Sequence, residues 1–276
     1  MRIINSVHPE DFKKYSTSLV RERFLLDDLA QKDNINFVYT HYDRMIVGVA
    51  MPGAHPIDLP DYVNLRADHF LERREMGIIN VGGEGNILAG DKKFHLSKLD
   101  CLYVGKGTEN VKFESLEPGN PAVFYILSAP AHAVHPTALL KKEDATGGPM
   151  GSADTANKRT IYRYIHKDGL KSCQLVMGLT ILETGSVWNT IPAHTHDRRM
   201  EVYFYFDVPD NQAVFHYMGE PQETRHILVR NREAVVSPPW SIHAGSGTSN
   251  YGFIWGMAGE NIEYGDMDIV QLHELR

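Results

Sequence analysis

The chain has 276 residues, of which 42% are hydrophobic and 23% charged, enough for one large or two modest domains and too apolar for an intrinsically disordered chain. Lys and Arg number 28 against 35 Asp and Glu, and this net charge of −7 argues against a general nucleic-acid binder. No apolar run approaches the roughly 20 residues of a membrane span, and no signal-peptide core is present, so we expect a cytoplasmic protein without a membrane partner.

The first predicted elements are two short helices near the N-terminus. Pro9 can open the first, and Ser18 can cap the second, whose apolar stripe is Leu19, Val20 and Phe24. After residue 36 the helical period gives way to short apolar segments separated by Gly, Pro, Asn and Asp, which is typical of strands. These segments are 37–39, 46–49, 77–81, 101–104 and 123–127. Many short strands with little helix predict a sandwich or barrel.

A polar segment interrupts the strand pattern in the middle of the chain, and we interpret residues 131–159 as a linker. The pattern resumes with segments 160–165, 174–177, 201–206, 213–218, 226–229, 234–237 and 251–257. The prediction is therefore two β-rich halves, residues 1–130 and 160–276. The two cysteines, Cys101 and Cys173, lie far apart and give neither a disulfide framework nor a cysteine zinc site.

The halves have features of a diverged repeat. Each contains an Arg-Arg pair before a strand, at 73–74 and at 198–199. Aligning the pairs places His69 on His194, but Leu71 on His196. If the repeat holds, only the second half keeps a full set of metal ligands.

The second half carries the residues that indicate chemistry. His194 and His196 are two residues apart, so on a strand both imidazoles leave the same face. Glu201 breaks that parity and can join them only if the chain bends in between. His243 follows a proline pair at 238–239 and is the fourth candidate. Three imidazoles and a carboxylate suit Zn, Fe, Mn, Ni or Cu, with little selectivity from ligand type alone.

This pattern resembles the cupin superfamily, in which HxH is followed after three or four residues by Glu and later by His. Longer runs are similar to the 5-keto-4-deoxyuronate isomerase family, and they cover most of the chain: 70–75, 103–107, 194–206, 222–226 and 240–243. The resemblance implies a mostly β bicupin, with two double-sheet jelly-roll barrel halves and short N-terminal helices. It further implies a homohexamer with one Zn²⁺ per chain, held by His194, His196, Glu201 and His243.

The resemblance also implies an activity. It is that of an intramolecular oxidoreductase, an aldose–ketose isomerase that converts 5-dehydro-4-deoxy-D-glucuronate to 3-deoxy-D-glycero-2,5-hexodiulosonate in the catabolism of pectin and other polyuronides. Two alternatives stay open, because spacing alone indicates only a metal cupin. One is a metal-dependent cupin dioxygenase, and the other is a non-catalytic cupin that binds a sugar acid.

The catalytic residues follow less directly. An anionic sugar acid needs a cation, and Arg matches a carboxylate best. Arg199 shares the strand parity of Glu201, and Arg225 lies in the run 222–226. Glu223 and His226, in the same run, are candidate proton carriers. Tyr203 is a third, since it shares the strand face of Glu201, but a buried structural role accounts for it better. No organic cofactor is predicted.

Overall fold

The computed structural model describes all 276 residues and divides them into two compact units. The first unit comprises Met1–Ile4, Asp28–Thr146 and Arg163–Met177, and the second comprises Asn5–Asp27, Gly147–Tyr162 and Gly178–Arg276. Residues near the N-terminus therefore belong to the C-terminal unit, and a short segment after residue 162 belongs to the N-terminal one. This exchange was not predicted from the sequence. None of the helices is long and apolar enough to cross a membrane.

The first unit consists of two sheets that enclose an apolar core. The seven-stranded sheet has the order β1 (Arg2–Ile4), β3 (Asn34–Thr40), β4 (Ile46–Met51), β11 (Phe124–Pro130), β6 (Arg74–Asn80), β9 (Cys101–Val104), β12 (Ala138–Leu140). The four-stranded sheet has the order β5 (Ile57–Asp58), β10 (Lys112–Ser115), β7 (Gly85–Ala89), β8 (Lys92–Leu96). Two short 3-10 helices, η1 (Val63–Leu65) and η2 (Lys142–Asp144), lie in its loops. Phe113 and Phe124 meet across the two sheets with ring centroids 5.7 Å apart, so the inward faces of both sheets form one core.

The second unit repeats this architecture. Its seven-stranded sheet has the order β13 (Thr146–Met150), β14 (Arg159–Ile165), β15 (Val176–Leu182), β23 (Gly252–Gly259), β18 (Arg199–Phe206), β21 (Ala234–Ser237), β2 (Leu25–Leu26). Its four-stranded sheet has the order β16 (Trp188–Asn189), β22 (Ile242–Gly247), β19 (Val214–Gly219), β20 (Arg225–Val229). A small third sheet pairs β17 (His194–Thr195) with β24 (Asp268–Ile269), and η3 (Leu272–Glu274) follows it.

The strand orders of the two units correspond position by position, which supports the predicted repeat. The second arginine of each Arg-Arg pair opens the same strand of its sheet, β6 or β18. Both Arg74 and Arg199 are buried, and both donate to backbone carbonyls, those of Arg44 and Ser128 in the first case. At the edge of the sheet, β2 of the second unit occupies the place that β12 has in the first.

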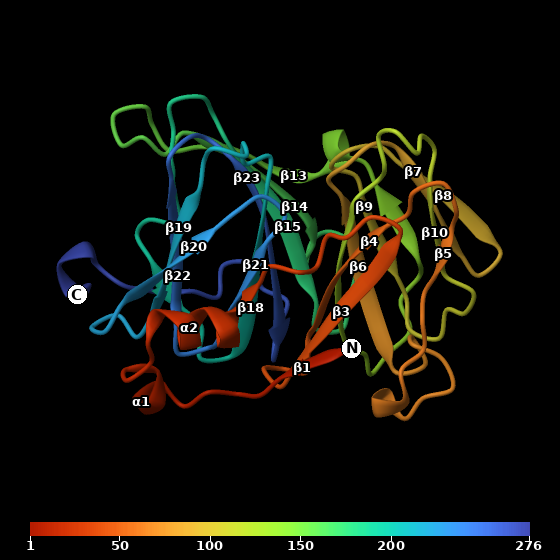
Figure 1. Cartoon of the computed structure of the whole chain (residues 1–276), viewed down its shortest axis with the longest axis horizontal. Coiled ribbons are helices and arrows are strands. Elements are labelled where there is room, and N and C mark those ends of the chain that lie inside the picture. Colours follow the sequence, from red (N-terminus) through yellow and green to blue (C-terminus); the bar gives the residue numbers. More distant parts are fainter. The chain divides into compact units, whose positions relative to one another are not determined.

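The N-terminal helices belong to the second unit. Pro9 opens α1 (Pro9–Phe12), as predicted, but the cap of α2 (Thr17–Phe24) is Ser16, whose Oγ accepts from the backbone of Leu19. The predicted cap, Ser18, is wrong because it lies inside the helix. Figure 1 shows α2, near the red end of the chain, beside the blue strands β20 and β21, which it contacts. Phe24 is fully buried against Trp240 there, with centroids 6.4 Å apart.

A buried carboxylate ties the exchanged segment Arg163–Met177 into the first unit. Glu75 of β6 is fully buried and accepts hydrogen bonds from the backbone N–H groups of Cys173, Gln174 and Leu175, at 2.7, 2.8 and 2.9 Å. The hydroxyl of Tyr103 donates to the same carboxylate at 2.8 Å. Four donors thus depend on one side chain for their pairing.

Removing this acceptor is expected to destabilise the protein strongly. In Glu75→Ala, buried donors lose their partner at a cost of about 1–3 kcal/mol each, so we expect the free energy of unfolding to fall by roughly 3 kcal/mol or more. Urea denaturation followed by circular dichroism measures this change. Glu84→Ala, which removes a carboxylate with 60% of its side chain exposed, is the control and should cost far less. A loss below about 1 kcal/mol in Glu75→Ala would contradict the structural role.

Candidate metal centre

Four side chains from three strands and a connecting turn meet in the second unit. His194 lies on β17, His196 directly follows that strand, Glu201 lies on β18, and His243 lies on β22. A turn at residues 197–198 separates β17 from β18 and supplies the predicted bend. All four side chains are buried, and their ligand atoms lie within 4.8 Å of one another. The residues named from their spacing are therefore brought together.

The contacts within the cluster are short. Oε2 of Glu201 lies 2.9 Å from Nε2 of His196 and 2.8 Å from Nε2 of His243. Nε2 of His243 is also 2.9 Å from Nε2 of His194. Imidazole nitrogens and a carboxylate oxygen that converge on one point in a buried site form a donor set for a divalent transition metal. The four residues thus fit a metal ion, and the cluster could hold one.

The electrostatics of the cluster agree with this use. Burial, and after it the neighbouring His243, lower the pKa of His194 to about 2, so its imidazole is neutral and keeps a lone pair for a metal. Burial alone would raise the pKa of Glu201, but the neighbouring imidazoles of His243 and His196 hold it well below its ordinary value. The site therefore combines a neutral imidazole with an ionised carboxylate.

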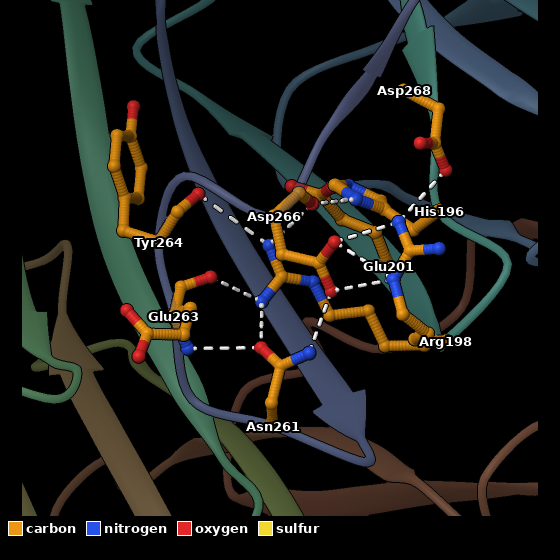
Figure 2. Close-up of polar contacts among 9 residues, drawn as sticks. His196, Arg198, Glu201, Asn261, Glu263, Tyr264, Asp266 and Asp268 are labelled. Carbon is orange, nitrogen blue, oxygen red and sulfur yellow. Dashed lines mark hydrogen bonds and ion pairs between the residues drawn. The ribbon is translucent and has the colours of Figure 1, made fainter.

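A second contact orients His196. Its Nδ1 lies 2.5 Å from the backbone carbonyl oxygen of Asp266, an atom that can only accept. Nδ1 therefore carries the proton, and Nε2 presents its lone pair to the cluster. Figure 2 shows this contact beside Glu201 and Arg198.

The cluster opens on a cavity of about 300 Å³. Three of the four residues, His194, His196 and Glu201, are among its lining residues. Most of the other walls are apolar, and they comprise Met150, Ile161, Ile191, Pro192, Phe253, Trp255, Met257, Met267 and Ile269. The cavity is thus a largely apolar chamber with the His/Glu cluster on one wall.

Few other polar groups face this chamber. Arg159, at the start of β14, is the one Lys or Arg in the lining. Its Nη1 donates to the carbonyl of Asn157 at 2.8 Å, which leaves further guanidinium N–H groups for a ligand. The hydroxyls of Tyr203 and Thr190 are 2.7 Å apart on the lining. Burial raises the pKa of Tyr203 well above its ordinary value, so its phenol stays protonated.

Sequence reasoning did not identify Arg159. It lies inside the segment interpreted as a linker, in a polar stretch without any motif, although it directly precedes the alternating strand pattern of 160–165. One feature of the sequence could have indicated Arg159: it is the cation directly before a predicted strand in the half that contains the His/Glu cluster.

The predicted substrate-binding Arg199 has other partners. It is fully buried, as its strand parity predicted, but it is not among the lining residues of the cavity. Nη1 donates to the carbonyl of Glu263 at 2.6 Å, and Nη2 donates to the carbonyl of Asp266 at 3.0 Å. These donors hold the backbone of the C-terminal segment rather than a ligand.

Of the other three predicted catalytic residues, Arg225 and His226 lie on β20 and Glu223 lies just before it. Strand β19 separates β20 from β22, the strand of His243. Arg225 forms a 2.7 Å ion pair with Glu223, and His226 is exposed. None of the three lines the cavity with the cluster. Their catalytic roles therefore stay predictions, with no contact to the site to support them.

The fold and this cluster define the chain as a bicupin with a candidate metal centre in its second half. Similar solved structures agree on the fold. An IolB-like protein from Salmonella typhimurium LT2 superposes with a TM-score of 0.72 at 16% identity, covering 90% of this chain and 96% of that one. An oxalate decarboxylase from Bacillus subtilis, studied for its Mn(II) centres, gives a TM-score of 0.53 at 13% identity, over 83% of this chain and 71% of that one.

The chain belongs to the KduI/IolB family, whose model matches residues 25–274. A protein from Shouchella clausii is 51% identical over 276 residues, and one from Caldicellulosiruptor bescii is 53% identical over 276 residues, each covering the whole of both chains. A third, from Formosa agariphila, is 54% identical over 268 residues, or 97% of this chain and 96% of that one. All three carry the name 4-deoxy-L-threo-5-hexosulose-uronate ketol-isomerase. The resemblance to this isomerase family is confirmed.

Proposed function

We propose that this protein is a ketol-isomerase that acts on 4-deoxy-L-threo-5-hexosulose uronate, also called 5-dehydro-4-deoxy-D-glucuronate, and forms 3-deoxy-D-glycero-2,5-hexodiulosonate. The observation that carries the proposal is the buried His/Glu cluster open to a chamber with a single cationic side chain. The full-length relatives that bear this name supply the identity of the substrate. A role in the catabolism of pectin or related polyuronides, a cytoplasmic location and a homohexameric assembly belong to the same proposal.

The proposed metal is Zn²⁺, one per chain, held by His194, His196, Glu201 and His243. Four protein ligands are typical of closed structural zinc sites, but here three of the four also line a cavity, so a ligand can reach the centre. A bound divalent ion would act as a Lewis acid that polarises the carbonyl group of the substrate.

The side chains around the chamber fit the rest of the reaction. The isomerisation moves a proton from the carbinol carbon to the neighbouring aldehyde carbon through an enediol, and it needs no oxidant because substrate and product are isomers. The hydroxyls of Tyr203 and Thr190 share one hydrogen bond, so one of them donates to the other and the second can donate its proton to a substrate oxygen. The apolar walls limit the access of water to the enediol.

Arg159 is the proposed partner of the substrate carboxylate. Its guanidinium fork matches the two carboxylate oxygens, and no other Lys or Arg lines the chamber. The strand order β14, β15, β23, β18 places it three strand spacings from Glu201, or about 14 Å along the sheet. Both residues line the same chamber, which can take a short sugar acid with its carboxylate at Arg159 and its carbonyl at the His/Glu cluster.

An NMR time course tests the proposal. Metal-loaded protein and a metal-stripped, still folded sample are each incubated with 5-dehydro-4-deoxy-D-glucuronate under anaerobic conditions. We expect the loaded protein to form the 2,5-diketo acid without oxygen, which also separates an isomerase from a cupin dioxygenase. We expect the stripped sample to lose this activity and to regain it when Zn²⁺ is restored. Failure of the loaded protein to convert the substrate would contradict the proposed activity and favour a sugar-acid binding cupin.

A further inference from the structure

The C-terminal segment of residues 260–270 touches both the metal centre and the wall of the chamber. Tyr264, Met267 and Ile269 line the chamber, and the backbone carbonyl of Asp266 contacts His196. We infer that Asp266 is a positioning residue: clamped by Arg198 and Asn261, it aims its backbone carbonyl at His196 and so fixes the metal-binding tautomer of that ligand. This inference rests on the metal site of the proposed function and adds the group that prepares one ligand.

The first observation is the contact itself. His196 is 2% exposed, so its ring depends on protein groups for its hydrogen bonds. A neutral imidazole exists in two tautomers, and the nitrogen without the proton is the one that can bind a metal. The Asp266 carbonyl at 2.5 Å selects the tautomer with the proton on Nδ1. A displaced carbonyl would leave the buried ring free to adopt the wrong tautomer or to turn.

The second observation is the clamp on the side chain of Asp266. Nε and Nη2 of Arg198 lie 2.8 and 2.6 Å from Oδ1 of this carboxylate, and Nδ2 of Asn261 lies 2.6 Å from Oδ2. Figure 2 shows the carboxylate held between these two residues. Arg198 and Asn261 thus occupy both oxygens of this carboxylate. Such charge-assisted, forked contacts fix orientation as well as distance.

The third observation is the buried guanidinium of Arg199 beneath the same segment. It donates to the backbone carbonyls of Glu263 and Asp266, at 2.6 and 3.0 Å, and more weakly to that of Tyr264 at 3.4 Å. Burying a cation is costly unless its donors are paired, so these carbonyls and the arginine hold one another in place. The carbonyl oxygen of Asp266 therefore accepts from both Arg199 and His196. These two contacts restrain the position of the loop relative to His196.

The arrangement predicts a coupled loss when the clamp is removed. Partners of this kind typically contribute about 10- to 100-fold to metal affinity, so we expect Asp266→Ala to weaken Zn²⁺ binding at least about tenfold. We also expect a higher KM at saturating metal, because Tyr264 and Met267 lie on the same loop and form part of the chamber wall. Arg198→Lys should weaken Zn²⁺ binding less than Arg198→Ala, since an ammonium keeps the charge but not the fork.

The experiment measures the dissociation constant for Zn²⁺ by chelator competition and the visible absorption of the Co²⁺-substituted protein, for the wild type and each variant. Asp268→Asn is the matched control. It removes the other carboxylate that Arg198 contacts, at 2.8 Å and half exposed, and Asp268 has no side-chain contact with His196. We expect its Zn²⁺ affinity and Co²⁺ spectrum to match the wild type within about twofold.

Wild-type Zn²⁺ affinity and an unchanged Co²⁺ spectrum in folded Asp266→Ala would overturn the inference. If that variant does not fold, the same result in Arg198→Ala and Arg198→Lys would overturn it equally. A wild-type protein that binds no stoichiometric metal would instead overturn the metal site of the proposed function, and the inference with it. Melting temperatures of the metal-saturated variants separate a local loss of ligand geometry from general destabilisation.

Discussion

Replacing Glu201 by glutamine is expected to reduce kcat by about 10³-fold, with a parallel loss of metal affinity. Glu201 is the one anionic residue of the cluster, and its Oε2 lies within 2.9 Å of two imidazole nitrogens. The amide keeps the shape of the side chain but removes the charge that balances a divalent ion. Lewis-acid stabilisation is worth several kcal/mol, and a loss of about 4 kcal/mol corresponds to the stated factor.

Steady-state kinetics and metal analysis of the purified Glu201→Gln variant measure this effect. Glu183→Gln is the control, because Glu183 pairs with Lys158 at the surface of the same unit and its side chain is 44% exposed. We expect the control to retain wild-type kinetics and metal content. A Glu201→Gln variant with full metal content and a kcat near that of the wild type would show that the cluster does not serve the reaction.

Replacing Arg159 by glutamine is expected to lower kcat/KM by about 10²-fold, mainly through a higher KM. A charge-assisted hydrogen bond contributes about 1.5–3 kcal/mol, and the upper part of that range corresponds to this factor. Arg159→Lys should recover part of the loss, because the lysine keeps the charge but cannot bind both carboxylate oxygens. Kinetics with the natural substrate and with an uncharged ester of its carboxylate measure the effect.

The ester provides the decisive comparison. If Arg159 binds the carboxylate, the wild type should prefer the acid over the ester, and the Arg159→Gln variant should lose most of this preference. Lys158→Gln is the matched control, since it removes an exposed cation from the adjacent position. An Arg159→Gln variant that still prefers the acid by the wild-type factor would exclude this role.

The approach of His194, His196 and Glu201 could be predicted from the sequence because these residues are close along the chain, whereas His243 lies 49 residues beyond His194. His194 and His196 are two residues apart, so the alternation of side chains along a strand places them on one face. Glu201 is an odd number of residues further on, and it can reach that face only if the chain bends. The same alternation predicted that Arg199 points inward. It could not predict the partners of that arginine, because they are backbone carbonyls more than sixty residues further along the chain.

The parts that escaped prediction depend on long-range pairing. β24 is only two residues long and pairs with β17, so no periodic pattern marks the C-terminal segment as a wall of the site. β2 is equally short, and its pairing with β21 assigns the N-terminal helices to the second unit. A polar stretch around Arg159 resembles a linker, because the chamber it lines forms only when distant strands assemble. Local patterns identified the strands, and tertiary contacts decided what they enclose.

The pairing of β2 with β21 has a consequence for biosynthesis. Arg21, just before β2, donates to the carbonyl of Leu228, which lies 207 residues further along the chain. At roughly 5–20 residues per second, a ribosome needs about 10–40 s to make that intervening stretch. The N-terminal helices thus leave the ribosome long before the sheet that will receive them exists. During this interval their apolar residues, including Phe24, have no folded partner to pack against. Chaperones that bind hydrophobic segments can shield them until β21 is made.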